Sequence, residues 1–144
     1  MKVKACPQGK RFIEFVRHLN IRAADHVICP KKSKKLRAAG FRMLEYGSFK
    51  SVWVHKRYPL YVLKIYRRNT GYIKDGYEVP KRLDKAFLHP IKKTKSYQIQ
   101  HKVQKVKWGE GIAKFCGMFS SIYDIAPRNI GKFKEKIVVI DFCS

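Results

Sequence analysis

The stretch that decides the fold runs from residue 41 to residue 66 and reads FRMLEYGSFKSVWVHKRYPLYVLKIY. It contains three short runs rich in apolar and β-branched residues, separated by Tyr46-Gly47 and by Lys56-Arg57-Tyr58-Pro59. Glycine and proline are typical turn residues, and runs of this length and composition are typical of strands. The pattern therefore predicts three consecutive antiparallel strands.

One lysine, Lys64, stands inside the third of these runs, Tyr61-Val62-Leu63-Lys64-Ile65-Tyr66. An ammonium group in an apolar strand loses hydration, and an anion beside it offsets that cost. Phosphate oxygens are such a partner, whereas the competing interpretation is an edge-strand lysine that points to solvent. Glu78 or Asp84 could supply a carboxylate that pairs with Lys64, and the sequence does not choose between them.

A second pattern lies near the C-terminal end, where Asp124 is followed by Asn129 and, after eleven further residues, by Asp141-Phe142. A polar turn is predicted over residues 131–136 and a short buried strand over residues 137–140. The two aspartates and the asparagine can supply a base, Asp124, and two hard-oxygen ligands for magnesium, Asn129 and Asp141. Taken alone, Asp-x-x-x-Arg-Asn is also a common composition for a surface turn.

The order of these features resembles the protein-kinase fold and, more narrowly, the small early Ser/Thr protein kinase of short-tailed coliphages. The resemblance covers about residues 38–142: residues 39–49 resemble the approach to the glycine-rich loop, and residues 124–129 resemble the catalytic loop. It implies an α+β fold with an antiparallel N-lobe sheet, helices, and a minimal C-lobe containing only the catalytic loop and the metal-binding strand. We expect a single compact domain over residues 1–144, divided into an N-terminal helix and basic connector, an N-lobe-like sheet and helix, and a minimal C-lobe (residues 1–37, 38–104 and 105–144).

The resemblance also implies two cofactors, ATP and Mg2+, and a role for individual residues. Lys64 would contact the phosphates, Asp124 would be the catalytic base, and Asn129 with Asp141 would bind the metal. The remaining cofactor-binding positions would be Gly47, Ser48, Phe49 and Val62.

The chain departs from the family pattern at several of these positions. Glu45 and Lys50 stand where the loop has its other two glycines, and Glu45 would bring a negative charge near the phosphates unless it turned outward. Ile122 and Tyr123 precede the proposed base in place of His and Arg, and Cys143 replaces the Gly after Asp-Phe. Only two residues follow Phe142, so we expect the activation segment to be lacking.

The net charge is extreme, because 33 Lys and Arg oppose 10 Asp and Glu and give +23. A field of this size attracts polyanions in a salt-dependent way. The cations concentrate in residues 31–37, 92–95 and 102–107, and each run alone is also consistent with a solvated loop. No nucleic-acid-binding signature accompanies them, so base-specific recognition is not expected.

Other segments give weaker signals. Phe12, Phe15, Val16 and Leu19 have helical spacing and predict a helix over residues 10–19 with a buried apolar stripe. A short helix or extended segment is expected over residues 34–39, helices over 80–88 and 110–119, and a strand over 97–103; the last helix would direct Ile112, Phe115 and Phe119 inward. The four separated cysteines favour neither zinc nor disulfides. The lack of any apolar stretch of membrane-spanning length predicts no membrane association and a soluble protein in the cytoplasm.

Two functions are expected from the sequence. The first is a phage-type, ATP-dependent Ser/Thr protein kinase that transfers phosphate to, or acts on, host proteins in the host cytoplasm. The alternative is a catalytically weak or inactive kinase-fold protein whose basic surface binds or inhibits a nucleic-acid-associated or acidic host partner.

Overall fold

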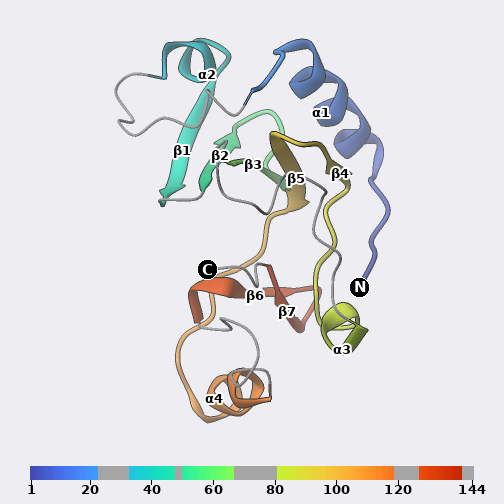
Figure 1. Cartoon of the computed structure of the whole chain (residues 1–144), viewed down its shortest axis with the longest axis vertical. Coiled ribbons are helices and arrows are strands. Elements are labelled where there is room, and N and C mark those ends of the chain that lie inside the picture. The colour runs from blue at the N-terminus through green and yellow to red at the C-terminus, as the bar shows by residue number, and fades with distance from the viewer. Residues whose placement is uncertain (23–32, 48–49, 67–80, 119–126, 141–144) are drawn as a thin grey trace. The chain divides into compact units, whose positions relative to one another are not determined.

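The computed structural model describes residues 1–22, 33–47, 50–66, 81–118 and 127–140 (Figure 1). The fold is α+β, with a five-stranded antiparallel sheet and few helices. The chain forms two compact units. We call residues 3–77 and 90–102 the sheet unit, and residues 1–2, 78–89 and 103–144 the hairpin unit.

The sheet unit contains the five-stranded sheet, whose strand order is β1-β2-β3-β5-β4. The three strands predicted over residues 41–66 are confirmed, and the strand predicted over 97–103 forms over 97–101. β4 was not predicted, because its two lysines read as part of a charged loop; charged residues are common on edge strands, where they discourage further pairing. The strands are β1 (Phe41–Tyr46), β2 (Lys50–His55), β3 (Tyr61–Tyr66), β4 (Lys92–Lys93) and β5 (Tyr97–His101).

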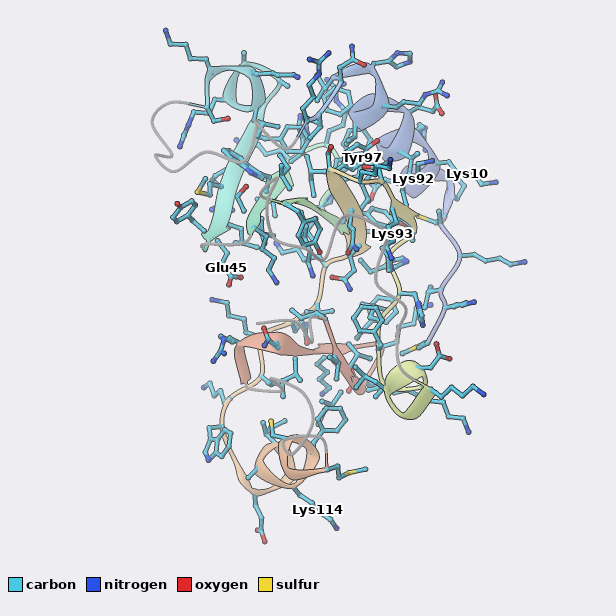
Figure 2. The ribbon with its side chains drawn as sticks, viewed as in Figure 1. Lys10, Glu45, Lys92, Lys93, Tyr97 and Lys114 are labelled. Carbon is cyan, nitrogen blue, oxygen red and sulfur yellow. The ribbon has the colours of Figure 1, made fainter. Side chains whose placement is uncertain are left out.

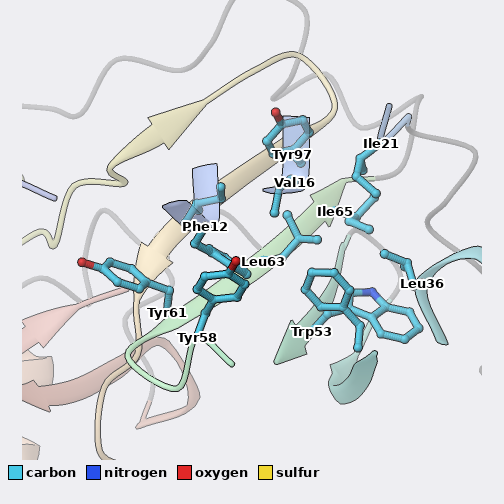
Figure 3. Close-up of a cluster of buried hydrophobic side chains, with 12 residues drawn as sticks. Phe12, Val16, Ile21, Leu36, Trp53, Tyr58, Tyr61, Leu63, Ile65 and Tyr97 are labelled. Atoms are coloured by element: carbon cyan, nitrogen blue, oxygen red, sulfur yellow. The ribbon is translucent and has the colours of Figure 1, made fainter. Parts of the chain in front are cut away.

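One face of the sheet packs against helix α1 (Pro7–His18). The helix begins three residues earlier than predicted, because Pro7 fits the first turn, where no backbone N–H is needed. Phe12 and Val16 are fully buried, as the helical spacing predicted. Figure 3 shows them against side chains of the sheet, including Trp53, Tyr61, Leu63, Ile65 and Tyr97. The short helix α2 (Lys34–Ala38) forms as one of the two expected alternatives and buries Leu36 in the same cluster.

The hairpin unit is built around two paired strands, β6 (Ile130–Phe133) and β7 (Lys136–Val139). The polar turn predicted over residues 131–136 is therefore wrong for its first half, because Ile130–Phe133 pairs with β7. The turn itself is limited to Lys134 and Glu135, which have φ of 48° and 66°. Positive φ at two consecutive residues is typical of a tight hairpin turn whose twist matches that of the strands.

The helix predicted over residues 80–88 is wrong for most of its length, because α3 extends only over Lys81–Asp84. The chain after it bonds to β7: Leu88 N–H donates to Val139 O at 2.9 Å, and Val139 N–H donates to Ala86 O at 2.8 Å. These tertiary hydrogen bonds replace the ones that would have continued the helix.

Helix α4 (Glu110–Gly117) forms close to its predicted bounds. Its buried residue is Cys116, while Ile112 and Phe115 are half-buried and Phe119 lies outside the described residues. A 3₁₀ turn, η3 (Pro127–Asn129), leads directly into β6. None of the helices in the described part of the chain is long and apolar enough to cross a membrane.

Candidate functional site

Lys64 lies in the middle of the sheet and is buried. β3 is the central strand of the five, and the Lys64 side chain is only 3% exposed. The interpretation of Lys64 as a solvent-facing edge lysine is therefore wrong. Its neighbours across the sheet are Val52 on β2 and Gln98 on β5. Opposite residues in an antiparallel pair share a face, so these side chains lie on the face away from α1.

The surroundings of Lys64 disfavour its charged form. Burial, and next the repulsion of Lys50, lower the pKa of the Lys64 ammonium well below its ordinary value, while the charge of Glu45 raises it in part. Strongly perturbed pKa values cluster at functional sites, and an anion bound beside Lys64 would favour its charged form.

The other proposed cofactor-binding residues of the sheet unit are partly described. Val62 is buried on the Lys64 face and forms a small apolar cluster with Val52 and Val54. The N–H of Gly47 donates to the carbonyl of Lys50 at 2.9 Å, which closes the loop between β1 and β2. Ser48 and Phe49, at the tip of that loop, lie outside the described residues.

In the hairpin unit the structure places the proposed metal ligand Asn129 at the end of η3, with a side chain that is 7% exposed. The N–H of Ile140 donates to the carbonyl oxygen of Asn129 at 2.8 Å. Asp141, the second proposed ligand, follows Ile140 directly in the chain. Asp141 and the proposed base Asp124 both lie outside the described residues.

The hairpin that joins these positions is held by a neighbouring segment of its own unit. Lys132 and Gln104 exchange two backbone hydrogen bonds, of 2.9 and 3.0 Å. Gly131 is buried beside this contact, and a Cβ atom added there would collide with the side chain of Val103. The close approach of the two backbones therefore requires glycine at position 131.

Of the two carboxylates considered from the sequence as partners of Lys64, only Asp84 lies in the described part of the chain. Asp84 accepts a hydrogen bond from His89 Nε2 at 2.8 Å, and Glu78 lies outside the described residues. Among the described residues, Glu45 is a carboxylate whose charge raises the pKa of Lys64. In the sequence its charge was considered only in relation to the phosphates. No sequence pattern indicates that Glu45 acts on Lys64, because this relation depends on the pairing register of β1.

Among the described residues, no three His, Cys, Asp or Glu side chains come together as ligands of a metal ion. The proposed magnesium ligands are an amide oxygen and a carboxylate, which suit a hard cation that keeps part of its water shell. Asn129 fits such a role by its burial and by its position at the base of the hairpin.

The positive charge is concentrated in the sheet unit. Its residues include 22 Lys and Arg against 4 Asp and Glu, a formal charge of +18, while the hairpin unit has 11 against 6, or +5. Figure 2 shows Lys10 on α1 and Lys92 and Lys93 on β4. Exposed cations occur on four elements of this unit, α1, α2, β1 and β4, at positions Lys10, Arg11, Arg17, Lys34, Lys35, Arg37, Arg42, Lys92 and Lys93.

Comparisons of the chain with protein-family models, with curated proteins and with solved structures gave no match. The functional argument therefore depends on the residues and their geometry.

Proposed function

We propose that the chain is a magnesium- and ATP-dependent phosphotransferase of the protein-kinase type that acts on Ser or Thr hydroxyls of a protein. One observation carries the proposal: Lys64 is buried at the centre of an antiparallel sheet, on its third strand in chain order. In protein kinases the phosphate-contacting lysine lies on the third strand, behind a loop between the first two strands that covers the phosphates. β1, β2 and the loop at Gly47 supply the corresponding elements.

The resemblance gives roles to residues in both units. In the sheet unit, Lys64 would bind the phosphates, Val62 would offer apolar surface to the nucleotide, and the loop of Gly47, Ser48 and Phe49 would cover it. In the hairpin unit, Asp124 would position and deprotonate the acceptor hydroxyl.

Magnesium would be held by Asn129 and Asp141. The hydrogen bond between Ile140 and Asn129 supports this pair, because it places the chain just before Asp141 beside Asn129. When bound, the ion would neutralise the charge that develops on the phosphoryl oxygens. If the chain is phage-encoded, as the resemblance implies, the protein substrate would belong to the host cell.

A second function is favoured by a separate observation, the charge of +18 on the sheet unit. A kinase-fold protein with little transferase activity would use this surface to bind an acidic or nucleic-acid-associated partner and inhibit it. Such binding would be governed by counterion release and would weaken steeply with salt.

The phosphotransferase function is tested by measuring both nucleotide binding and phosphoryl transfer. Saturating ATP with magnesium should raise the melting temperature of the wild type, by the equivalent of about 2.7 kcal/mol at a hundredfold excess over Kd. Lys64→Met should remove this rise, whereas Lys102→Met, at an exposed position of the same unit, should keep it.

Transfer is measured with labelled ATP and a panel of protein acceptors. Asp124→Asn should retain nucleotide binding and lose transfer, because it leaves the phosphate contacts in place. A wild type that does not respond to nucleotide defeats the proposal. A wild type that binds nucleotide but transfers nothing favours the binding-protein function.

A further inference from the structure

β1 contains an irregularity close to the proposed site. Met43 pairs with Trp53, but the next paired residue is Glu45, which lies opposite Val52, so Leu44 is an extra residue in the strand. An extra residue of this kind is a β-bulge, and bulges commonly turn a side chain to the other face of a sheet next to functional sites.

The bulge decides which face of the sheet carries Glu45. In a regular strand Leu44 would oppose Val52, and Glu45 would share the α1 face with Met43 and Trp53. With the bulge, Glu45, Val52 and Lys64 form one row across β1, β2 and β3. Neighbouring strands are roughly 4.8 Å apart, so the backbones of Glu45 and Lys64 are about 10 Å apart, with Val52 between them. Glu45 is exposed on the edge strand, so its charge acts on the buried Lys64 across this distance.

Carboxylates are scarce in this unit. Among its described residues they are Glu14 and Glu45, and Glu14 pairs with Arg17 at 2.7 Å on the exposed side of α1. The other titratable groups on the Lys64 face are Arg42 on β1, Lys50 on β2, Lys93 on β4 and Tyr66 on β3. Tyr66 donates its hydroxyl proton to Gln98 Oε1 at 3.0 Å. Glu45 is thus the anion that the described part of this face provides.

We propose that Glu45 is a built-in counter-ion for Lys64, a positioning residue that the β1 bulge places on the same face as the buried ammonium and whose charge keeps that group protonated before phosphate arrives. The phosphate part of this inference rests on the proposed function, whereas the charge relation between Glu45 and Lys64 does not. The electrostatics of the face agree with it, since burial and Lys50 lower the pKa of Lys64 and Glu45 opposes them.

Two opposing effects follow for a bound triphosphate. Glu45 repels the phosphates, but it also keeps Lys64 charged to a higher pH. Replacing Glu45 by the isosteric Gln should therefore strengthen triphosphate binding at low pH, where Lys64 is protonated in either protein, and weaken it at higher pH. The pH optimum for binding should move down.

The direct test is the titration of Lys64, followed by NMR of protein with ¹³C-labelled lysine and assigned with the Lys64→Met variant. Glu45→Gln should lower the titration midpoint of Lys64 by at least about 0.5 pH unit, as expected for loss of a unit charge at this range in partly screened surroundings. Glu14→Gln removes the same charge from the same unit and should leave the midpoint in place. Glu45→Asp, which keeps the charge on a shorter side chain, should restore part of the shift.

The second readout is binding of inorganic triphosphate by the same proteins between pH 6 and pH 10. The Glu45→Gln variant should have its optimum at lower pH than the wild type. An unchanged Lys64 midpoint in Glu45→Gln, or an equal shift in Glu14→Gln, overturns the counter-ion role. If the wild type does not bind triphosphate at any pH, the result counts against the proposed function. The Lys64 titration still decides the role of Glu45.

Discussion

The backbone N–H of Ile140 donates a hydrogen bond of 2.8 Å to the carbonyl oxygen of Asn129. This bond extends the pairing of β6 with β7, which runs from Ile130 opposite Val139 to Phe133 opposite Lys136. The eleven residues between Asn129 and Asp141 therefore form one tight hairpin, whose last residue, Ile140, lies beside Asn129. We expect the relative position of the two proposed metal ligands to depend on the integrity of this hairpin.

Gly131→Ala tests that dependence. The added methyl group would meet the side chain of Val103, so the backbones of β6 and of Gln104 would have to separate. Overpacking of this kind destabilises by about 1–3 kcal/mol, which urea unfolding would measure. Gly111→Ala is the matched control, because nothing lies within 4 Å of a Cβ at this helical position, and alanine there should stabilise slightly. Equal stability of the two variants would show that the close approach at Gly131 is not required.

Magnesium dependence tests the ligand pair itself. In the wild type, ATP should raise the melting temperature more with magnesium than with a chelator, since the ion links nucleotide to protein. Asp141→Asn removes one ligand charge, so its response to ATP should be nearly the same in both conditions. Asp84→Asn, a carboxylate of the same unit that is bonded to His89, should keep the wild-type difference. If magnesium enhances the ATP-induced rise in melting temperature as much in Asp141→Asn as in the wild type, Asp141 is not a ligand of the ion.

Local patterns predicted those parts of the fold that local interactions determine. The three strands over residues 41–66 follow from their composition and turns, and α1 follows from the spacing of Phe12 and Val16. The helix over residues 80–88 failed because Ala86 and Leu88 bond to β7, a partner about fifty residues later in the chain. β6 was missed because its pairing, not its composition, makes it a strand.

The candidate site divides in the same way. The burial of Lys64 could be anticipated, because it is embedded in an apolar run that forms a central strand. The position of Glu45 could not, because a bulge of one residue decides which face it occupies, and nothing in the sequence around Leu44 marks that bulge.

The lowered pKa of Lys64 has a consequence for stability. Between the lowered pKa in the folded protein and the ordinary value in the unfolded chain, the unfolded state binds more protons, so stability should rise with pH. Lys64→Met removes this contribution and the desolvation of a buried charge, and should stabilise the nucleotide-free protein by roughly 0.5–2 kcal/mol at the acidic end of that range. This gain in stability of Lys64→Met over the wild type should shrink as the pH approaches the ordinary pKa of lysine.

Melting curves between pH 6 and pH 10 would measure this difference. Lys102→Met, at an exposed position, should run parallel to the wild type across the whole range. A constant difference between Lys64→Met and the wild type would mean that Lys64 keeps its charge throughout, contrary to the effect of its burial.

The last prediction concerns the positive charge of the sheet unit. If this surface binds a polyanion, the triple variant Lys92→Gln, Lys93→Gln, Lys95→Gln should bind a nucleic-acid duplex more weakly. Its binding should also depend less steeply on salt, because a protein that makes fewer phosphate contacts releases fewer counterions. The matched control is Lys81→Gln, Lys85→Gln, Lys114→Gln, which removes three exposed lysines from the hairpin unit and leaves the same net charge. Fluorescence anisotropy at several salt concentrations would give both slopes. Equal slopes in the two variants would show that only the total charge matters and that β4 and the turn after it form no binding surface.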